Sequence, residues 1–355
     1  MPLRAGEWVV VRSEAEILAT LDENAALDGL PFMPEMLAFC GRRLRVHRRA
    51  DKTCDTITGD TRGRRMRGTV HLEGVRCDGA AHGGCQAACL MLWKEAWLAR
   101  AGPAPAAPLW RLVAASAGAP ASTGPAPGCS RDDVLRAAVR APGETPARTA
   151  YRCQITQLLE ASSPLAWWQP GQYLRDWLSG NVRLLLLLEV FVLRSLAQVV
   201  TGRGFSLKVR IYDAVAKLFG QSPWPYHPGR LRGRTPRETL GLEPGELVRV
   251  KSHEQILETL TGMHNRGLSF APEMVRYCGG TYRVRARVDR ILNEKTGVLL
   301  LMKNDCIVLE DVVCQSECSA NRLFCPRGIY AYWREIWLER AEPAPGSRPD
   351  PAPGR

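Results

Sequence analysis

The sequence predicts an α+β fold with two repeated strand-rich modules, each closed by a C-terminal helix and joined by a helical segment. The repeat is visible at both ends of each copy. The copies begin GEWVVVRS at Gly6–Ser13 and GELVRVKS at Gly245–Ser252, and they end WKEAWL at Trp93–Leu98 and WREIWL at Trp333–Leu338. Features kept in both copies are expected to be needed for structure or chemistry.

Composition supports several folded domains. The chain has 355 residues, of which 45% are hydrophobic and 24% charged, as is ordinary for globular proteins. An Ala/Pro-rich stretch is typical of a flexible linker, and a Pro-rich end is typical of a disordered tail. The predicted divisions are module 1 at 1–101, the linker at 102–129, a helical middle at 130–240, module 2 at 241–341 and the tail at 342–355.

Each copy is expected to start with a strand followed by a short helix. Trp8–Val11 is strand-like, and Ser13 with Glu16 three residues later forms a capping-box pattern. Ser252 and Gln255 repeat that pattern in the second copy. Further strands are predicted at Tyr282–Val288, Leu299–Met302 and Ile307–Leu309.

The closing helix of each copy is predicted from spacing. Cys85, Cys89, Trp93 and Trp97 recur every four residues, which places them on one face of a helix over Cys85–Arg100. In the second copy Cys325-Pro326 would begin the equivalent helix, with proline in the first turn. Two cysteines one turn apart on a helix can share one metal.

The repeat comparison points to a set of four cysteines in each copy. Three positions correspond between the copies, whereas the fourth lies after the third in one copy and before it in the other. A tetrahedral thiolate site tolerates this change, because the metal requires four sulfurs in any chain order. The predicted metal ligands are Cys40, Cys77, Cys85 and Cys89 in the first copy and Cys278, Cys314, Cys318 and Cys325 in the second.

The identity of the metal stays open at this point. Two zinc ions would stabilise the modules, and two iron–sulfur clusters are the alternative, since both take four thiolates. The N-terminus lacks the apolar core of a signal peptide, so a reducing cytoplasm is expected. Disulfides or inert buried thiols remain the other interpretation. His82 is expected either as a surface histidine or as a substitute ligand.

Four further cysteines have no counterpart in the other copy, and they are expected to be ordinary thiols. These are Cys54, Cys129, Cys153 and Cys306.

Charge and hydropathy suggest several kinds of partner. The net charge is +12, and arginine runs at 42–49, 62–67 and 230–234 fit either nucleic-acid binding or a solvated face. The second copy lacks the 62–67 run. The apolar segment 182–200 is too short and too charged to span a membrane. It fits a buried helix, a helix lying in the membrane surface or a protein-binding helix.

No catalytic motif is recognisable. The sequence has no Walker loop, no dinucleotide-binding glycine pattern, no G-x-S-x-G and no H-E-x-x-H. Glu95 and Glu335 recur in both copies, and helix-surface salt bridges with Lys94 and Arg334 are the expected explanation. Whether there is a reaction, and on what substrate, stays open.

Several strings resemble those of a little-characterised bacterial family of two-repeat, cysteine-rich proteins. They are Phe39-Cys40-Gly41, His82–Ala87 with Trp93–Leu98, and Asn321–Arg327 with Tyr332–Leu338. The resemblance covers both repeats and the helical middle, and it implies no settled activity. The strand-like opening Pro244–Val250 is similar to the first strands of small SH3-like barrels, which implies fold alone.

Three functions follow as hypotheses. The first is a metal-binding accessory or scaffold protein of a bacterial biosynthetic pathway, which would bind a protein partner through its helical middle. The second is an iron–sulfur redox protein or enzyme with two clusters. The third is a nucleic-acid binder that uses the arginine runs.

Overall fold

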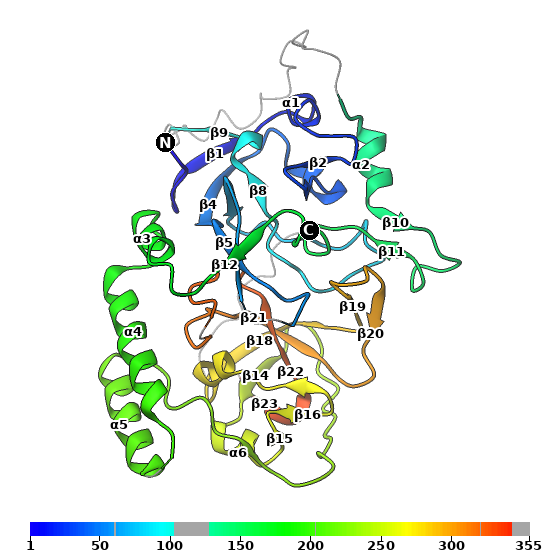
Figure 1. The fold of residues 1–355 in the computed structure, drawn as a ribbon. Coiled ribbons are helices and arrows are strands. Elements are labelled where there is room, and N and C mark those ends of the chain that lie inside the picture. The colour runs from blue at the N-terminus through cyan, green and yellow to red at the C-terminus, as the bar shows by residue number, and fades with distance from the viewer. Residues whose placement is uncertain (60–61, 103–127, 203, 320, 343–355) are drawn as a thin grey trace. The chain divides into compact units, whose positions relative to one another are not determined.

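The computed structural model describes residues 1–59, 62–102, 128–202, 204–319 and 321–342 (Figure 1). The linker predicted at 102–129 and the tail predicted at 342–355 lie almost wholly outside these ranges. The chain divides into two units, described separately below. The first unit contains Met1–Arg194, Arg290–Leu301 and Gln315–Ile329, and the second contains the remainder. Both mix helices with small antiparallel sheets, so the α+β class is confirmed.

The main sheet of the first unit has the strand order β8-β7-β4-β1-β9. Strand β1 pairs antiparallel with β4 and β9, and its valines at positions 9 and 11 are buried. Its strands are β1 (Trp8–Val11), β4 (Arg43–Arg49), β7 (Thr69–Leu72), β8 (Trp93–Lys94) and β9 (Leu98–Arg100). Helix α1 (Glu14–Leu18) follows β1, and the predicted capping box of Ser13 and Glu16 is confirmed.

Aromatic side chains fill the core beneath this sheet. Phe32 meets Trp93 and Trp97 edge to face, with ring centroids 6.3 and 5.2 Å apart. The indole of Trp97 is fully buried and donates to Thr20 Oγ1 at 3.1 Å. A buried indole N–H needs such an acceptor, so this hydrogen bond fixes the orientation of the ring.

The predicted closing helices are wrong. Cys85–Leu92 has no regular helix, and β8, the 3-10 turn η2 (Glu95–Trp97) and β9 follow it. Ala88 has φ 45°, a left-handed conformation that interrupts a right-handed helix. The four-residue interval between Trp93 and Trp97 instead spans the strand β8 and the turn η2. Both indoles therefore reach the same core without a helix.

The second unit contains a five-stranded sheet with the order β22-β21-β18-β14-β23. Its strands are β14 (Leu247–Val250), β18 (Thr281–Arg287), β21 (Ile307–Val313), β22 (Tyr330–Trp333) and β23 (Leu338–Arg340). Each strand takes the place that its counterpart holds in the first sheet. Phe270 likewise contacts Trp333 and Trp337, and Trp337 Nε1 donates to Thr259 Oγ1 at 2.9 Å. The turn η5 (Glu335–Trp337) replaces the second predicted helix.

The middle of the chain is helical only in part. Its helices are α2 (Arg131–Ala137), α3 (Gly171–Leu178), α4 (Leu184–Val199) and α5 (Phe205–Leu218). Between α2 and α3 lie the short strands β10 (Val139–Ala141), β11 (Ala150–Tyr151) and β12 (Ser163–Leu165).

Short elements complete both units. The first unit also has β2 (Ala26–Leu27), β3 (Leu30–Pro31), η1 (Pro34–Phe39), β5 (Lys52–Cys54), β6 (Gly63–Arg65), β19 (Arg290–Leu292) and β20 (Leu299–Leu301). The second has β13 (Gly229–Arg230), α6 (His253–Leu257), β15 (Thr261–Gly262), β16 (His264–Asn265), β17 (Leu268–Ser269) and η4 (Pro272–Tyr277). Helix α6 has the capping box predicted for Ser252 and Gln255.

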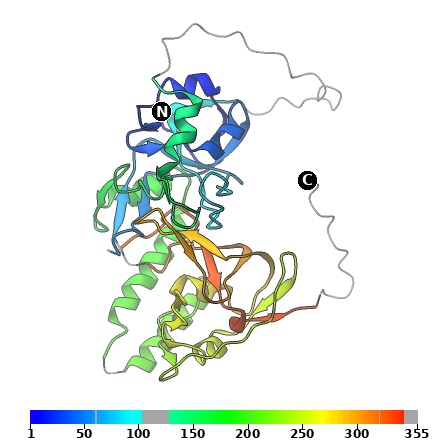
Figure 2. The same cartoon turned by 90° about the vertical axis from the view of Figure 1, so that its right-hand side faces the viewer.

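The hairpin β19–β20 joins the first unit although it comes from the second half of the chain. Both views show this orange segment beside the green segment that contains β11 (Figures 1 and 2). Tyr151 N donates to Gly297 O at 2.8 Å. Gly297 has φ +74°, and a Cβ there would lie 2.3 Å from Tyr151 O. Only glycine permits this approach, which places the hairpin at the edge of the candidate site.

Helix α4 is not the buried helix that the apolar segment 182–200 suggested. It buries Val190 and Leu193, whereas Leu185 and Leu188 are exposed by 72% and 52%. Among the helices of the described residues, none has both the length and the apolar character needed to cross a bilayer.

Candidate metal site

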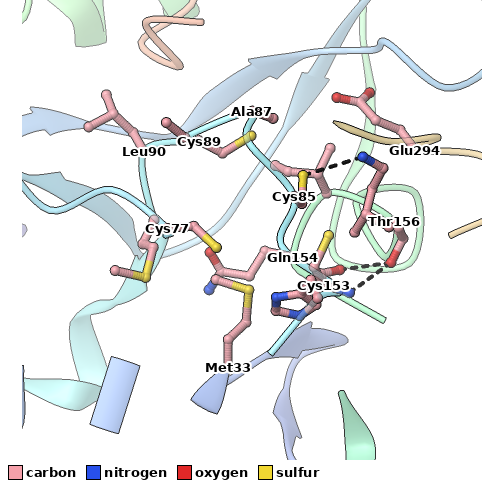
Figure 3. Close-up of a pocket in the computed structure, with 15 residues that line it drawn as sticks. Met33, Cys77, Cys85, Ala87, Cys89, Leu90, Cys153, Gln154, Thr156 and Glu294 are labelled. Atoms are coloured by element: carbon pink, nitrogen blue, oxygen red, sulfur yellow. Dashed lines mark hydrogen bonds between the residues drawn. The ribbon is translucent and has the colours of Figure 1, made fainter. Parts of the chain in front are cut away.

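Four thiols of the first unit line one pocket, which we call the thiol pocket (Figure 3). They belong to Cys77, Cys85, Cys89 and Cys153. The pocket encloses about 530 Å³, part of it open to solvent, and its other walls are mainly apolar. Figure 3 shows the four sulfur atoms around a common space. Three of these cysteines belong to the predicted first set, and Cys153 does not.

Glycine turns bring the pocket cysteines together. Cys77 N donates to Cys89 O at 2.9 Å, which joins the two ends of the loop. Within the loop, His82 N and Gly84 N both donate to Gly79 O. Gly79 has φ +74°, and a Cβ there would lie 2.1 Å from Cys85 O. A side chain at position 79 would therefore displace the backbone that carries Cys85.

The hairpin β19–β20 and the segment after β11 complete the walls. Leu292 N donates to Cys85 Sγ at 3.3 Å, an interaction drawn in Figure 3. Thr156 Oγ1 accepts from Cys153 N at 2.9 Å and fixes the turn that carries this thiol. A sulfur that accepts a backbone N–H resembles the ligand sulfurs of metal–thiolate centres, where such bonds tune the metal.

Burial favours the protonated form of three of these thiols when no metal is bound. It raises the pKa of Cys89 to about 12 and that of Cys153 to about 11, and it raises the pKa of Cys77 further still. Neighbouring thiols add to these shifts, because like charges at Cys77, Cys89 and Cys153 would repel. A bound cation would reverse this effect, since metal coordination deprotonates a thiol.

Glu35, Cys77 and His82 form a second possible ligand group at the edge of the pocket. Their ligand atoms lie within 4.8 Å of one another. His82 is 1% exposed, so its prediction as a surface histidine is wrong. Its Nδ1 lies 2.7 Å from Glu35 Oε1 and its Nε2 lies 3.2 Å from Arg152 O. Burial raises the pKa of Glu35, but His82 and backbone N–H groups outweigh burial and lower it.

Both ring nitrogens of His82 have partners, and one of these is Glu35, another member of the group. Glu35 Oε1 accepts from Ala81 N at 3.1 Å and lies 3.7 Å from Cys77 Sγ. It thereby ties the loop before Cys85 to the turn η1.

The predicted four-cysteine sets are not assembled as single-ion sites. Among the residues that the structure describes, only one group has three His, Cys or acidic ligand atoms within 4.8 Å of one another. That group is the triad of Glu35, Cys77 and His82. Cys40 and Cys278 follow η1 and η4 and pack against the two hydrophobic cores. Burial raises the pKa of each thiol, to about 11 and about 12. Their role as ligands stays a prediction.

The other three cysteines of the second set lie in different places. Cys314 follows β21 in the second unit, whereas Cys318 and Cys325 belong to the segment Gln315–Ile329 of the first unit. Cys325 is buried, and its thiol interacts with that of Cys54 of β5. The structure therefore places Cys54 next to Cys325, a cysteine that the sequence predicted as a metal ligand.

Sequence comparison missed Cys54 and Cys153, and the reason is structural. Each lacks a counterpart in the other copy, and the repeat was the only signal available. Their thiols reach other cysteines only through tertiary contacts, between β5 and the segment Gln315–Ile329, and between the loop after β11 and the loop 77–89.

Two other predicted features have internal roles. Arg64, in the run 62–67, donates to Leu159 O and Ser162 O and is therefore engaged in the fold. Glu335 is fully buried and bonds to Arg287, not to Arg334. Its predicted surface salt bridge is wrong, because the carboxylate faces backbone N–H groups inside the unit.

Comparison of the chain with family models, with curated proteins and with solved structures finds no match.

Proposed function

We propose that this chain is a metal-binding protein and that the thiol pocket holds an iron–sulfur cluster. The ligands would be Cys77, Cys85, Cys89 and Cys153. The observation that carries the proposal is the convergence of four thiols from two separate segments on one pocket. Four thiolates are the usual ligand set of such clusters, and irregular chain spacing is acceptable to them.

Sulfur spacing favours a cluster over a single zinc ion in this pocket. Zinc–sulfur bonds of about 2.3 Å in a tetrahedron place neighbouring sulfurs about 3.8 Å apart. No three of the four thiols come within 4.8 Å of one another. A [4Fe–4S] cluster binds each thiolate through a different iron atom, so its ligands stand further apart around a larger group.

The surroundings would suit electron transfer. Leu90, Met91 and Leu292 shield the pocket, and burial and hydrogen bonds to sulfur set the potential of a cluster. The N–H of Leu292 toward Cys85 Sγ would stabilise the reduced, more negative state. The redox hypothesis is therefore the one that the site supports best.

A role as an accessory or scaffold protein is the second candidate. Its support is a set of exposed apolar side chains of the first unit on and near α3 and α4. Trp168, Leu174, Leu185 and Leu188 are each more than half exposed. Exposed apolar side chains that gather in one patch are typical of protein or membrane contacts. The full-length protein should capture a partner protein, and Leu185→Glu should abolish this capture without changing the metal content. That result would support the accessory or scaffold role.

We also propose that the two five-stranded sheets arose by duplication of one SH3-like module. The matched strand orders and the matched Phe–Trp–Trp contacts support this. The proposed cluster and any redox activity do not depend on whether the two modules arose by duplication.

Anaerobic purification of the full chain tests the proposed cluster. We expect a brown protein with iron and acid-labile sulfide, and Cys153→Ala should remove both. Cys129→Ala is the matched control, because Cys129 is also a cysteine of the first unit but lies outside the pocket. A colourless protein without iron, or a Cys153→Ala protein with full iron and sulfide content, would refute the assignment.

A further inference from the structure

We infer that helices α3 and α4 of the first unit dock on the surface of a membrane that contains anionic lipids. The first observation is that the two faces of α3 are reversed. This helix buries Gln172 and Asp176, whereas Leu174, Trp177 and Leu178 are exposed by 53%, 42% and 50%. A helix at the surface of a globular protein normally buries its apolar face and exposes its polar face. The described part of the chain therefore leaves the apolar face of α3 uncovered.

Internal contacts hold α3 in this orientation. Asp176 Oδ2 pairs with Lys52 Nζ at 2.5 Å, and both side chains are 6% exposed. Gln172 Nε2 donates to Ala166 O at 2.9 Å. Turning the helix to bury its leucines would break this buried ion pair, and breaking such a pair is strongly destabilising. The exposed apolar face is therefore a fixed property of the fold.

Helix α4 presents a second apolar stripe. Leu185, Leu188 and Val192 are exposed by 72%, 52% and 44%. Their spacing of three and four residues places them on one face of the helix. Val190 and Leu193 lie on the other side and are buried. The packing of α4 within the protein therefore leaves this stripe free.

The apolar faces of α3 and α4 adjoin one contact between the two helices (Figure 1). The rings of Tyr173 on α3 and Phe191 on α4 meet edge to face, with their centroids 5.0 Å apart. Trp177 follows Tyr173 by one helical turn, so it lies beside this contact. Leu188 precedes Phe191 by one turn and lies beside it as well. The exposed side chains of the two helices are therefore neighbours.

Aromatic and basic side chains identify the occupant of this surface as lipid. Trp168 and Trp177 are exposed by 68% and 42%, and tryptophan is enriched where membranes meet water. Arg175 on α3 and Arg183 just before α4 are also exposed. Asp176, the one acid between residues 161 and 188, is buried. The exposed charge is therefore positive, as attraction to anionic headgroups requires.

A protein partner fits this surface less well. Leucine is under-represented among the residues that dominate the binding energy of protein interfaces. The exposed side chains of the α4 stripe also contain no hydrogen-bonding group. Leucine and tryptophan flanked by arginine are typical of helices that lie in a membrane surface. The inference uses the same side chains as the accessory role, but it names lipid as their contact, and it is independent of the proposed cluster.

Co-sedimentation of the full chain with lipid vesicles tests the inference. We expect binding to vesicles of phosphatidylcholine with phosphatidylserine, little binding to phosphatidylcholine alone, and weaker binding as the salt concentration rises. Leu185→Glu should lower the affinity for the anionic vesicles at least about tenfold, because it removes apolar area and adds a negative charge. Leu135→Glu is the matched control, because it makes the same change at an α2 leucine that is exposed by 47%. Both variants should keep the iron content of the wild type, which separates this test from that of the cluster.

Quenching of tryptophan fluorescence by brominated lipid provides a test without a change of charge. Trp168→Phe combined with Trp177→Phe should reduce the quenching, since the core indoles of Trp93 and Trp97 are fully buried. An unquenched wild type, or equal vesicle affinities of Leu185→Glu and Leu135→Glu, would overturn the inference. So would capture of a protein partner through α4 by a chain that binds no vesicles, a result that would support the accessory role instead.

Discussion

Removal of the Glu335 carboxylate should destabilise the second unit strongly. This carboxylate is fully buried and accepts backbone N–H groups of residues 240–242 as well as a bond from Arg287. Glu335→Ala leaves those donors and the guanidinium without their acceptor. Breaking a buried charged pair in this way costs about 3–5 kcal/mol. Arg287 is 32% exposed and regains water, so we expect the lower half of this range.

The corresponding glutamate of the first unit, Glu95, provides a comparison for the stability loss expected from Glu335→Ala. Glu95 accepts from Leu3 N and pairs with Arg49, but its side chain is 29% exposed. Glu95→Ala should therefore cost less than Glu335→Ala, about 1–3 kcal/mol. Glu339→Ala serves as the surface control, because its contact with Arg249 is exposed and long, at 4.0 Å. Exposed pairs of this kind contribute about 0–1 kcal/mol.

Urea unfolding monitored by tryptophan fluorescence measures these changes. Trp333 and Trp337 lie in the core next to Glu335, so their emission reports the second unit. We expect the midpoint to fall most for Glu335→Ala and least for Glu339→Ala. Equal midpoints for Glu335→Ala and Glu339→Ala would refute the reasoning, because they would show that the buried carboxylate contributes no more than an exposed one.

Two further predictions follow from the same kind of contact. Burial raises the pKa of Glu335, but its backbone partners and Arg287 outweigh burial and lower it. A lowered folded-state pKa contributes stability that is present above the unfolded value of about 4.3 and is lost as the pH falls below it. Urea midpoints at pH 7 and pH 4 should therefore differ more in the wild type than in Glu335→Gln, and equal differences would count against this. Gly79→Ala should lower the iron content of the thiol pocket, because its Cβ would meet Cys85 O. Gly59→Ala has the same φ of +74° but open space around it, so it should keep its iron, and equal losses would show that backbone strain alone matters.

Local structure could be predicted where neighbouring residues decide it. The first strand of each copy, both capping boxes and the strand over Thr281–Arg287 are confirmed. Each depends on side-chain alternation or on a hydrogen bond across three residues. The closing helices failed because a spacing of four residues also fits a strand followed by a 3-10 turn.

The candidate site was predictable only within one segment. Cys77, Cys85 and Cys89 lie on one loop, so the sequence alone could associate them. Cys153 and Cys54 could not be assigned, because no local pattern links either of them to other cysteines.

From the sequence alone came the α+β class, the repeated segments and three of the four thiols in the pocket. Those features depend on local pattern and on the internal comparison of the two copies. Tertiary structure decided which cysteines meet. It placed Arg290–Leu301 and Gln315–Ile329 in the first unit, and it brought Cys54 to Cys325 and Cys153 to the loop 77–89. The physical reason is that backbone pairing and core packing, which act between distant segments, determine where a thiol lies.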